Sequence, residues 1–158
     1  MSSEEYSLRK IASLLESGKY KKTHDMIVYL FQVWLEKMGI PKEKMIIRDS
    51  VSVKFKGKNE TLEVDLAIRK NNELPILFEI VEPDPNWSLD DPNTLRKIEL
   101  MLIRIFAYLL KPKRIFLTDG KILLIYDEKG SLIDRINLMT IDGKKEEELR
   151  SLIKSVSS

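Results

Sequence analysis

The sequence predicts an α/β (α+β) fold in which helices flank a mixed β-sheet of about five strands. Three observations lead to this prediction. Residues 45–81 contain three apolar segments joined by short turns, residues 91–110 have the pattern of one long helix, and a further strand and hairpin follow it. The chain has 158 residues, which is the length of one domain. We therefore expect residues 1–158 to form a single domain with its own core.

Two helices are expected before the sheet. The first runs from Ser2 to Ser17, because Ser2 and Glu5 have the spacing of a capping box. The second begins near Thr23, a suitable N-cap, and ends at Gly39. Their apolar stripes consist of Leu8, Ile11, Ala12 and Leu15 in the first helix, and of Ile27, Leu30, Phe31, Trp34 and Met38 in the second.

Three strands are then expected in succession. Residues 45–55 change to a period of two, which indicates a half-buried strand. Residues 76–81 are apolar except for Glu79, which is typical of a central strand covered on both faces. Between them, the strand at residues 61–69 is expected to turn Leu62, Val64, Leu66 and Ile68 to one face and Glu63, Asp65, Ala67 and Arg69 to the other.

The second half of the chain continues with a helix that has Asp91 as N-cap and Pro92 at its first position. A strand at residues 114–118 and the turn Asp119-Gly120 then predict a hairpin. Residues 131–138 are a candidate edge strand, and residues 144–156 a final helix. The side chains expected to face the core from the long helix are Leu95, Ile98, Leu102, Ile105, Phe106 and Leu109.

Composition excludes several classes of protein. Without cysteine, the chain has no disulfide, Cys zinc site or thiol nucleophile, and a single histidine, His24, excludes a multi-His metal site within one chain. We expect His24 to be a surface residue in the first turn of its helix. No membrane span or signal core is apparent, so we expect a cytoplasmic protein. The 33% charged content and the single glutamine would suit a thermophile.

Two carboxylates in strands are the informative chemical feature. Asp65 and Glu79 each lie among apolar residues, where a lone charge is costly unless it is paired or bound to a metal. Adjacent strands can bring both to one Mg²⁺ or Mn²⁺ ion, and the carbonyl of Ile80 would add an oxygen ligand. Such an ion can polarise a phosphoryl oxygen and activate water. The alternative is a pair satisfied by hydrogen bonds or by Arg69.

This region resembles the PD-(D/E)xK nuclease superfamily, and more narrowly the N-terminal nuclease domain of type I restriction enzyme R subunits. The resemblance covers residues 23–127, so the helices at 1–18 and 140–158 are peripheral and are candidates for a homodimer contact. It implies a restriction-endonuclease-like core. The segments that carry it are Leu35-Glu36-Lys37-Met38-Gly39-Ile40-Pro41, Arg48-Asp49, Glu63-Val64-Asp65-Leu66, Leu77-Phe78-Glu79-Ile80-Val81-Glu82-Pro83, Ile115-Phe116-Leu117-Thr118-Asp119-Gly120-Lys121 and Tyr126.

The chain departs from this superfamily at Val81, where the pattern has the lysine that orients the attacking water. Arg96 and Lys97 in the next helix, and Lys54 on a preceding strand, are candidates for a migrated cation. If one of them serves the site, the resemblance implies metal-dependent cleavage of DNA. If none does, it implies an inactive nuclease-fold module that binds DNA or a protein. A third reading is an unrelated α/β domain in which the acid pair is coincidental.

DNA is the expected partner. The net charge is only +2, so a basic patch must come from local sorting of charges. Lys19, Lys21 and Lys22 surround Tyr20, and basic residues interleaved with an aromatic suit nucleic acid. These three lysines and Lys54 are the candidate nucleic-acid contacts, although a solvated loop is the simpler reading of the cluster.

Overall fold

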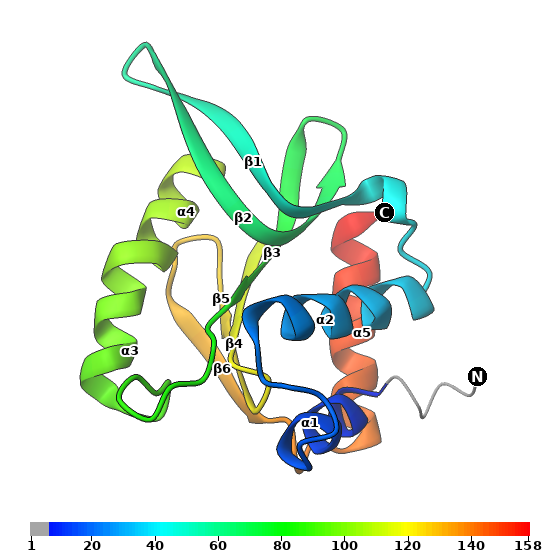
Figure 1. The fold of residues 1–158 in the computed structure, drawn as a ribbon. Coiled ribbons are helices and arrows are strands. Elements are labelled where there is room, and N and C mark those ends of the chain that lie inside the picture. Colours follow the sequence, from blue (N-terminus) through cyan, green and yellow to red (C-terminus); the bar gives the residue numbers. More distant parts are fainter. Residues whose placement is uncertain (1–6) are drawn as a thin grey trace.

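The computed structural model describes residues 7–158, which form three layers with a six-stranded sheet in the middle (Figure 1). Helices α1, α2 and α5 cover one face of the sheet, and the helical segment from α3 to α4 covers the other. The elements are α1 (Leu8–Glu16), α2 (His24–Lys37), the short 3-10 helix η2 (Lys42–Lys44), β1 (Met45–Phe55), β2 (Lys58–Lys70), β3 (Glu73–Ile80), α3 (Pro92–Ile98), the π-helical segment η3 (Glu99–Ile103), α4 (Arg104–Leu110), β4 (Arg114–Thr118), β5 (Ile122–Tyr126), β6 (Leu132–Asn137) and α5 (Gly143–Ser157).

Helix boundaries follow local capping signals. Thr23 and Asp91 are the N-caps of α2 and α3, as predicted, and each side chain accepts a hydrogen bond from a backbone amide three residues on. Helix α1 begins at Leu8 with Ser7 as its N-cap. The predicted start at Ser2 and the capping box of Ser2 with Glu5 lie outside the described residues.

The sheet has six strands rather than about five, because residues 132–137 do form the edge strand β6. The strands lie in chain order from β1 to β6. Strand β3 pairs antiparallel with β2 and parallel with β4, while the remaining neighbours are antiparallel. The mixed sheet and the central position of β3 are thus confirmed.

An irregularity in the first hairpin changes the predicted faces of β2. The regular pairing of β1 with β2 skips Arg48 and Asp65, and Arg48 has a φ of 48°. Beyond this point Val64 packs on the α3–α4 side of the sheet, whereas Leu66 packs on the other side. The prediction that Val64 and Leu66 share a face was therefore wrong, since the kink reverses the alternation of side chains.

The long helix of residues 92–110 contains the π-helical segment η3, which also changes a predicted face. An i→i+5 turn shifts the phase of the residues that follow it. Ile103 and Ala107 are buried as a result, whereas Ile105, expected in the core, is 43% exposed. At the start of η3, Glu99 accepts a hydrogen bond of 2.8 Å from the buried hydroxyl of Tyr126.

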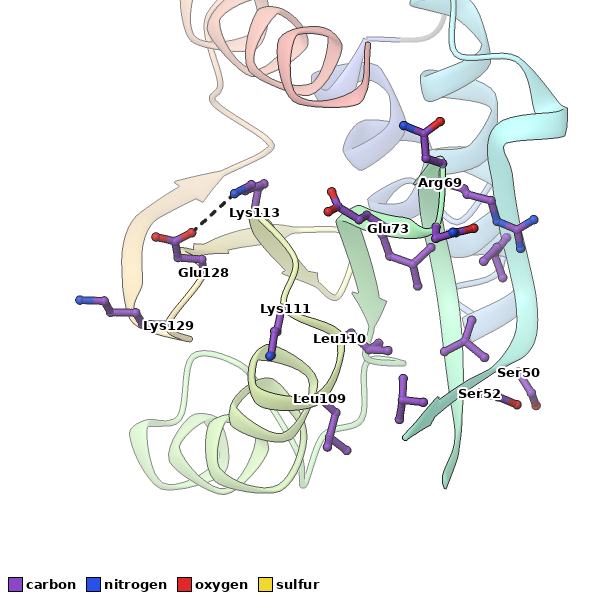
Figure 2. A pocket seen from close by; sticks show the side chains of 16 residues that line it. Ser50, Ser52, Arg69, Glu73, Leu109, Leu110, Lys111, Lys113, Glu128 and Lys129 are labelled. Carbon is purple, nitrogen blue, oxygen red and sulfur yellow. Dashed lines mark ion pairs between the residues drawn. The ribbon is translucent and has the colours of Figure 1, made fainter. Parts of the chain in front are cut away.

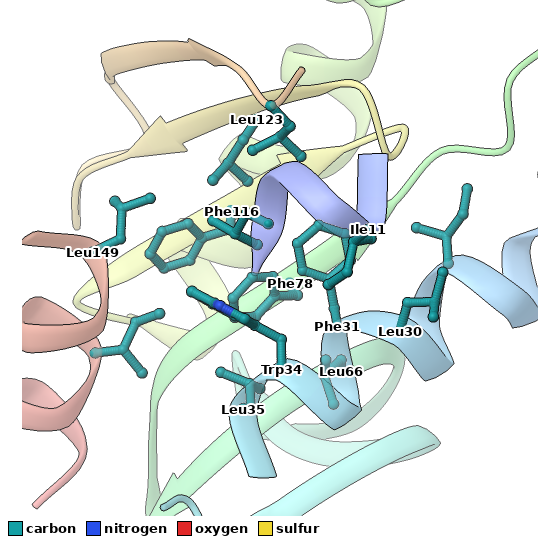
Figure 3. Packing of buried hydrophobic residues seen from close by; sticks show 14 of the residues in the cluster. Ile11, Leu30, Phe31, Trp34, Leu35, Leu66, Phe78, Phe116, Leu123 and Leu149 are labelled. Carbon is teal, nitrogen blue, oxygen red and sulfur yellow. The ribbon is translucent and has the colours of Figure 1, made fainter. Parts of the chain in front are cut away.

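The larger of the two apolar cores lies between the sheet and helices α1, α2 and α5 (Figure 3). Phe78 of β3 stacks on Phe116 of β4 with ring centroids 4.7 Å apart, and Phe31 of α2 packs against Phe78. Burial of three aromatic rings at this contact holds α2 firmly against the middle of the sheet. The first turn of α2 is thereby fixed beside Asp65.

None of the helices in residues 7–158 combines the length and the apolar character that crossing a membrane requires.

Candidate functional site

Asp65 and Glu79 come together where β2 separates from β3. The pairing of these strands runs from Lys70 of β2, with an irregularity between Lys70 and Ile68, and ends at Leu66 opposite Phe78. Asp65 is the next residue of β2 and Glu79 the next residue of β3, so both carboxylates lie at the point of divergence. Asp65 also lies opposite Arg48 at the kink described above.

The side chain of Asp65 provides a hydrogen-bond acceptor for β3 at the point where the backbone of β2 no longer pairs with it. Its Oδ2 accepts a hydrogen bond of 2.7 Å from the amide of Ile80, and its Oδ1 lies 2.9 Å from Nε2 of His24. Because a carboxylate oxygen accepts, Nε2 of His24 carries the proton in this pair. The side chain of Asp65 is 20% exposed, so solvent reaches this end of the pair.

Glu79 is buried and incompletely paired. The residue is 4% exposed, and its Oε1 has no hydrogen-bond partner among the described residues. Burial raises the pKa of Glu79 well above its usual value, and the charge of Asp65 and a hydrogen bond with it raise this pKa further. Glu79 therefore holds a proton more tightly than an ordinary glutamate.

His24 is the site residue that sequence reasoning missed. It begins α2 after the N-cap Thr23, and it was interpreted as a surface residue of the first turn. In the structure its side chain is about one-third exposed and contacts Asp65 across 41 residues of chain. Its Nδ1 lies 3.6 Å from Asp25, which pairs with Arg48. No local pattern predicts such a contact, because it depends on how α2 packs on β2.

The donor set around the pair suits a divalent cation only in part. The orphaned Oε1 of Glu79 and the neighbouring carboxylate of Asp65 are hard oxygen donors. However, Oδ2 of Asp65 already accepts a hydrogen bond from the amide of Ile80, and Oδ1 lies 2.9 Å from Nε2 of His24. Within residues 7–158, no group of three or more His, Cys, Asp or Glu side chains is arranged to hold a metal ion. A cation would therefore rest on two carboxylates and water.

The side chains that were candidates for the catalytic cation do not pair with Asp65 or Glu79 in the described residues. Arg96 and Lys97 are exposed on α3, and Lys54 is exposed near the tip of the β1–β2 hairpin. Among the described residues, none of these three forms an ion pair with either carboxylate. Val81 is partly buried just beyond β3, and its amide donates to the carbonyl of Thr118.

The lysines of the loop between α1 and α2 are all exposed. Lys22 forms an ion pair of 2.9 Å with Glu16 of α1. This pair and the nearby Asp25 of α2 reduce the positive potential that Lys19 and Lys21 produce.

No family model matches this chain, and comparisons with curated proteins and with solved structures gave no match either.

Proposed function

We propose that this protein is a nuclease-fold protein that binds DNA and hydrolyses a phosphodiester bond with the help of a divalent cation held by Asp65 and Glu79. The observation that carries the proposal is the meeting of these two carboxylates from neighbouring strands, one of them buried with an orphaned oxygen. A buried carboxyl group without a full set of partners is costly to stability, and such costs concentrate at functional sites.

The order of the elements around the pair supports the same proposal. Helix α2, the strands β1, β2 and β3, the helical segment from α3 to α4, and strand β4 follow one another in the chain. The first four strands are also neighbours in this order, with only β3 and β4 parallel. This order of elements and the mixed sheet support the restriction-endonuclease-like core that we propose, with the pair on β2 and β3.

A divalent cation bound here would supply Lewis-acid activation of water and stabilise negative charge on the phosphoryl group. The residues of the chain have separate tasks. Asp65 is held in place by the amide of Ile80 and by His24, so its carboxylate is oriented before any ligand arrives. Glu79 must release its proton to act as a ligand, which makes cation binding favour higher pH.

The test combines calorimetry with Mn²⁺ and a nicking assay on supercoiled DNA. We expect the wild type to bind Mn²⁺ and nick DNA, and Asp65→Asn and Glu79→Gln to lose both activities. Glu147→Gln, which removes an exposed carboxylate from α5, is the matched control and should keep both. Nicking that continues in EDTA, or that survives Asp65→Asn, would contradict the proposal.

The second candidate function is a nuclease-fold module that has lost catalysis and binds DNA or a partner protein. It is favoured by Val81 at the place of the motif lysine and by the exposed positions of Arg96 and Lys97. In this case the wild type binds Mn²⁺ weakly and is inert. Val81→Lys should then introduce metal-dependent nicking, because residue 81 lies about 7 Å along the chain from Glu79.

A further inference from the structure

A groove with a volume of about 950 Å³ lies at the opposite end of β3 from the acid pair (Figure 2). It is bounded by β1, by the β2–β3 turn and by the link from α4 to β4. On β3 it is lined by Glu73, which lies six residues, about 20 Å along the strand, from Glu79. On β1 its lining residues Ile46 and Ser50 lie on either side of Arg48. Its apolar lining consists of Ile46, Val51, Val53, Leu74, Leu109 and Leu110.

Cationic side chains dominate the charge of this groove. Its charged lining residues are the four cations Arg69, Lys111, Lys113 and Lys129 and the two carboxylates Glu73 and Glu128. This excess of two positive charges equals the formal net charge of the whole chain, which is +2. Positive charge is therefore sorted to this end of the molecule although the overall balance is nearly neutral.

The cations of the groove are available to a ligand. Lys113 lies 4.0 Å from Glu128, and both side chains are about 60% exposed, so their pairing contributes little. Within residues 7–158, Arg69 and Lys111 form no ion pair. Figure 2 shows the three lysines on one side of the groove and Arg69 on the other, so an anion between the walls meets positive charge from both.

Uncharged donors and an adjoining pocket extend this surface. Ser50, Ser52, Asn71 and Asn72 line the same groove and offer hydroxyl and amide groups. A second pocket of about 340 Å³ shares Arg69 and Asn71 with the groove. It adds Lys44 and Lys70 against a single acid, Glu43. The cationic track thus continues around the β2–β3 turn.

Beyond Glu79 the chain is acidic. The loop that follows β3 carries the exposed acids Glu82, Asp84, Asp90 and Asp91. Asp90 pairs with Arg135 at 2.7 Å, and the other three carboxylates repel a polyanion, so this loop supplies little of the attraction for DNA. The positive charge that attracts it must come from elsewhere on the molecule.

We propose that this groove, rather than the loop of Lys19, Lys21 and Lys22, is the main contact for the phosphodiester backbone of a nucleic acid. Cations on both walls suit phosphates, and the apolar lining suits the sugars between them. Among residues 7–158, no aromatic side chain lines the groove, so it offers no platform on which bases could stack. The inference rests on the DNA-binding part of the proposed function and is independent of catalysis.

The test is the salt dependence of binding to a labelled duplex of about 20 base pairs, measured by fluorescence anisotropy between about 50 and about 200 mM KCl. The groove variant replaces Arg69, Lys111 and Lys129 by alanine. The slope of log K against log salt is negative, and each lost phosphate contact reduces its magnitude by about 0.9. We therefore expect the magnitude of the slope to fall by about 2 to 3 in the groove variant. Affinity at the lower salt concentration should fall more than tenfold.

Two further triple-alanine variants locate the effect. Replacing Lys10, Lys144 and Lys154, which are exposed on α1 and α5, removes the same charge and should leave the slope unchanged. Replacing Lys19, Lys21 and Lys22 should also leave most of the salt dependence of binding in place. An unchanged slope in the groove variant, or an equal decrease in either of the other two, overturns the proposal. Equal slopes with duplex RNA would indicate that the groove recognises phosphate itself, and binding of DNA alone would identify DNA as its ligand.

A variant that is expected to bind nucleic acid more tightly provides a test that does not depend on weakened binding. Glu73→Gln with Glu128→Gln removes the carboxylates of the groove and should tighten binding several-fold at low salt. If affinity did not increase, the proposal would be contradicted.

Mn²⁺ calorimetry on the groove variant distinguishes the DNA-binding groove from the cation site at Asp65 and Glu79. Retained Mn²⁺ binding with a reduced slope supports the groove, whereas a wild type that binds DNA through the groove without binding Mn²⁺ would contradict only the acid-pair site.

Discussion

Two buried glutamates in this protein, Glu146 and Glu79, differ in the hydrogen-bond partners of their carboxylate oxygens. Glu146 of α5 is 7% exposed, and both of its oxygens have partners. Its Oε1 accepts a hydrogen bond of 2.7 Å from the amide of Leu8, and its Oε2 accepts one of 2.6 Å from Arg150. Glu79 is buried to a similar degree, yet its Oε1 has no partner among the described residues.

The difference separates a structural carboxylate from a candidate functional one. Glu146 ties the first turn of α1 to α5, where its negative charge also suits the positive end of the α1 dipole. Its burial is compensated by an amide and a guanidinium. Glu79 has a neighbouring carboxylate instead of a cation, which is unfavourable for both groups until a proton or a metal ion lies between them.

The largest effect that tests this comparison is expected from Glu146→Ala. The substitution leaves Arg150 without its partner and the amide of Leu8 without an acceptor, so we expect a loss of about 3 kcal/mol in the free energy of unfolding. Urea denaturation measures it. A loss below about 0.5 kcal/mol would show that Glu146 is not a structural carboxylate in the sense used above.

Asp65→Ala should have the next largest effect, a loss of about 2 kcal/mol in the free energy of unfolding. The substitution removes the acceptor for the amide of Ile80 and for His24, and it leaves the amide without a partner at a buried position. Asp65→Asn keeps an acceptor oxygen and should recover about half of the loss in the same denaturation experiment. If both variants were as stable as the wild type, the contacts of Asp65 would contribute nothing to the fold.

Glu79→Gln is expected to stabilise the protein, in contrast to the substitution at Glu146. The raised pKa of Glu79 means that the folded protein binds its proton more tightly than the unfolded chain. The stabilisation from this proton is present below the usual value of 4.5 and is lost as the pH rises through the folded pKa. Glutamine mimics the protonated form at every pH.

Denaturation midpoints of wild type and Glu79→Gln should therefore coincide near pH 4.5 and separate as the pH rises, with the variant the more stable at higher pH. A constant difference across this range would indicate that Glu79 does not change protonation between the folded and unfolded states. A decrease in stability on substitution would contradict the burial of an underpaired acid at this position.

The smallest effect is expected at Arg48, which lies opposite Asp65, and it can be compared with the effect at Arg150, the partner of Glu146. Arg48 pairs with Asp25 at 3.1 Å, but both side chains are more than half exposed. Arg48→Ala should change stability by no more than about 0.5 kcal/mol. Arg150 is only 22% exposed, so Arg150→Ala should cost several times more. Equal losses at the two positions would remove the distinction between the two networks.

Much of the fold follows from signals that occupy a few consecutive residues. Thr23 and Asp91 cap helices as predicted, and Asp119 accepts hydrogen bonds from the amides of Lys121 and Ile122 in the predicted turn. Such contacts depend on short segments of chain, so they can be read without knowing the rest of the molecule. The position of β3 at the centre of the sheet was likewise readable from its apolar run.

Other features depend on several segments at once. The reversal of faces at Arg48 and Asp65 arises because β1 and β2 deviate from the regular ladder together. The π-helical segment that moves Ile105 to the surface begins at Glu99, which accepts a hydrogen bond from Tyr126, 27 residues away. Neither deviation has a signature in the periodicity, because periodicity assumes uniform helices and strands.

The sequence by itself determined the caps, the turns, the strands and the presence of two acids within apolar strand segments, since each of these is set by neighbouring residues. The tertiary structure alone decided which partners those acids have. His24 reaches Asp65 across 41 residues, and Glu146 reaches Leu8 across 138. Packing of helices on the sheet sets both contacts, and with them it decides that Glu146 is fully paired and that Glu79 is not.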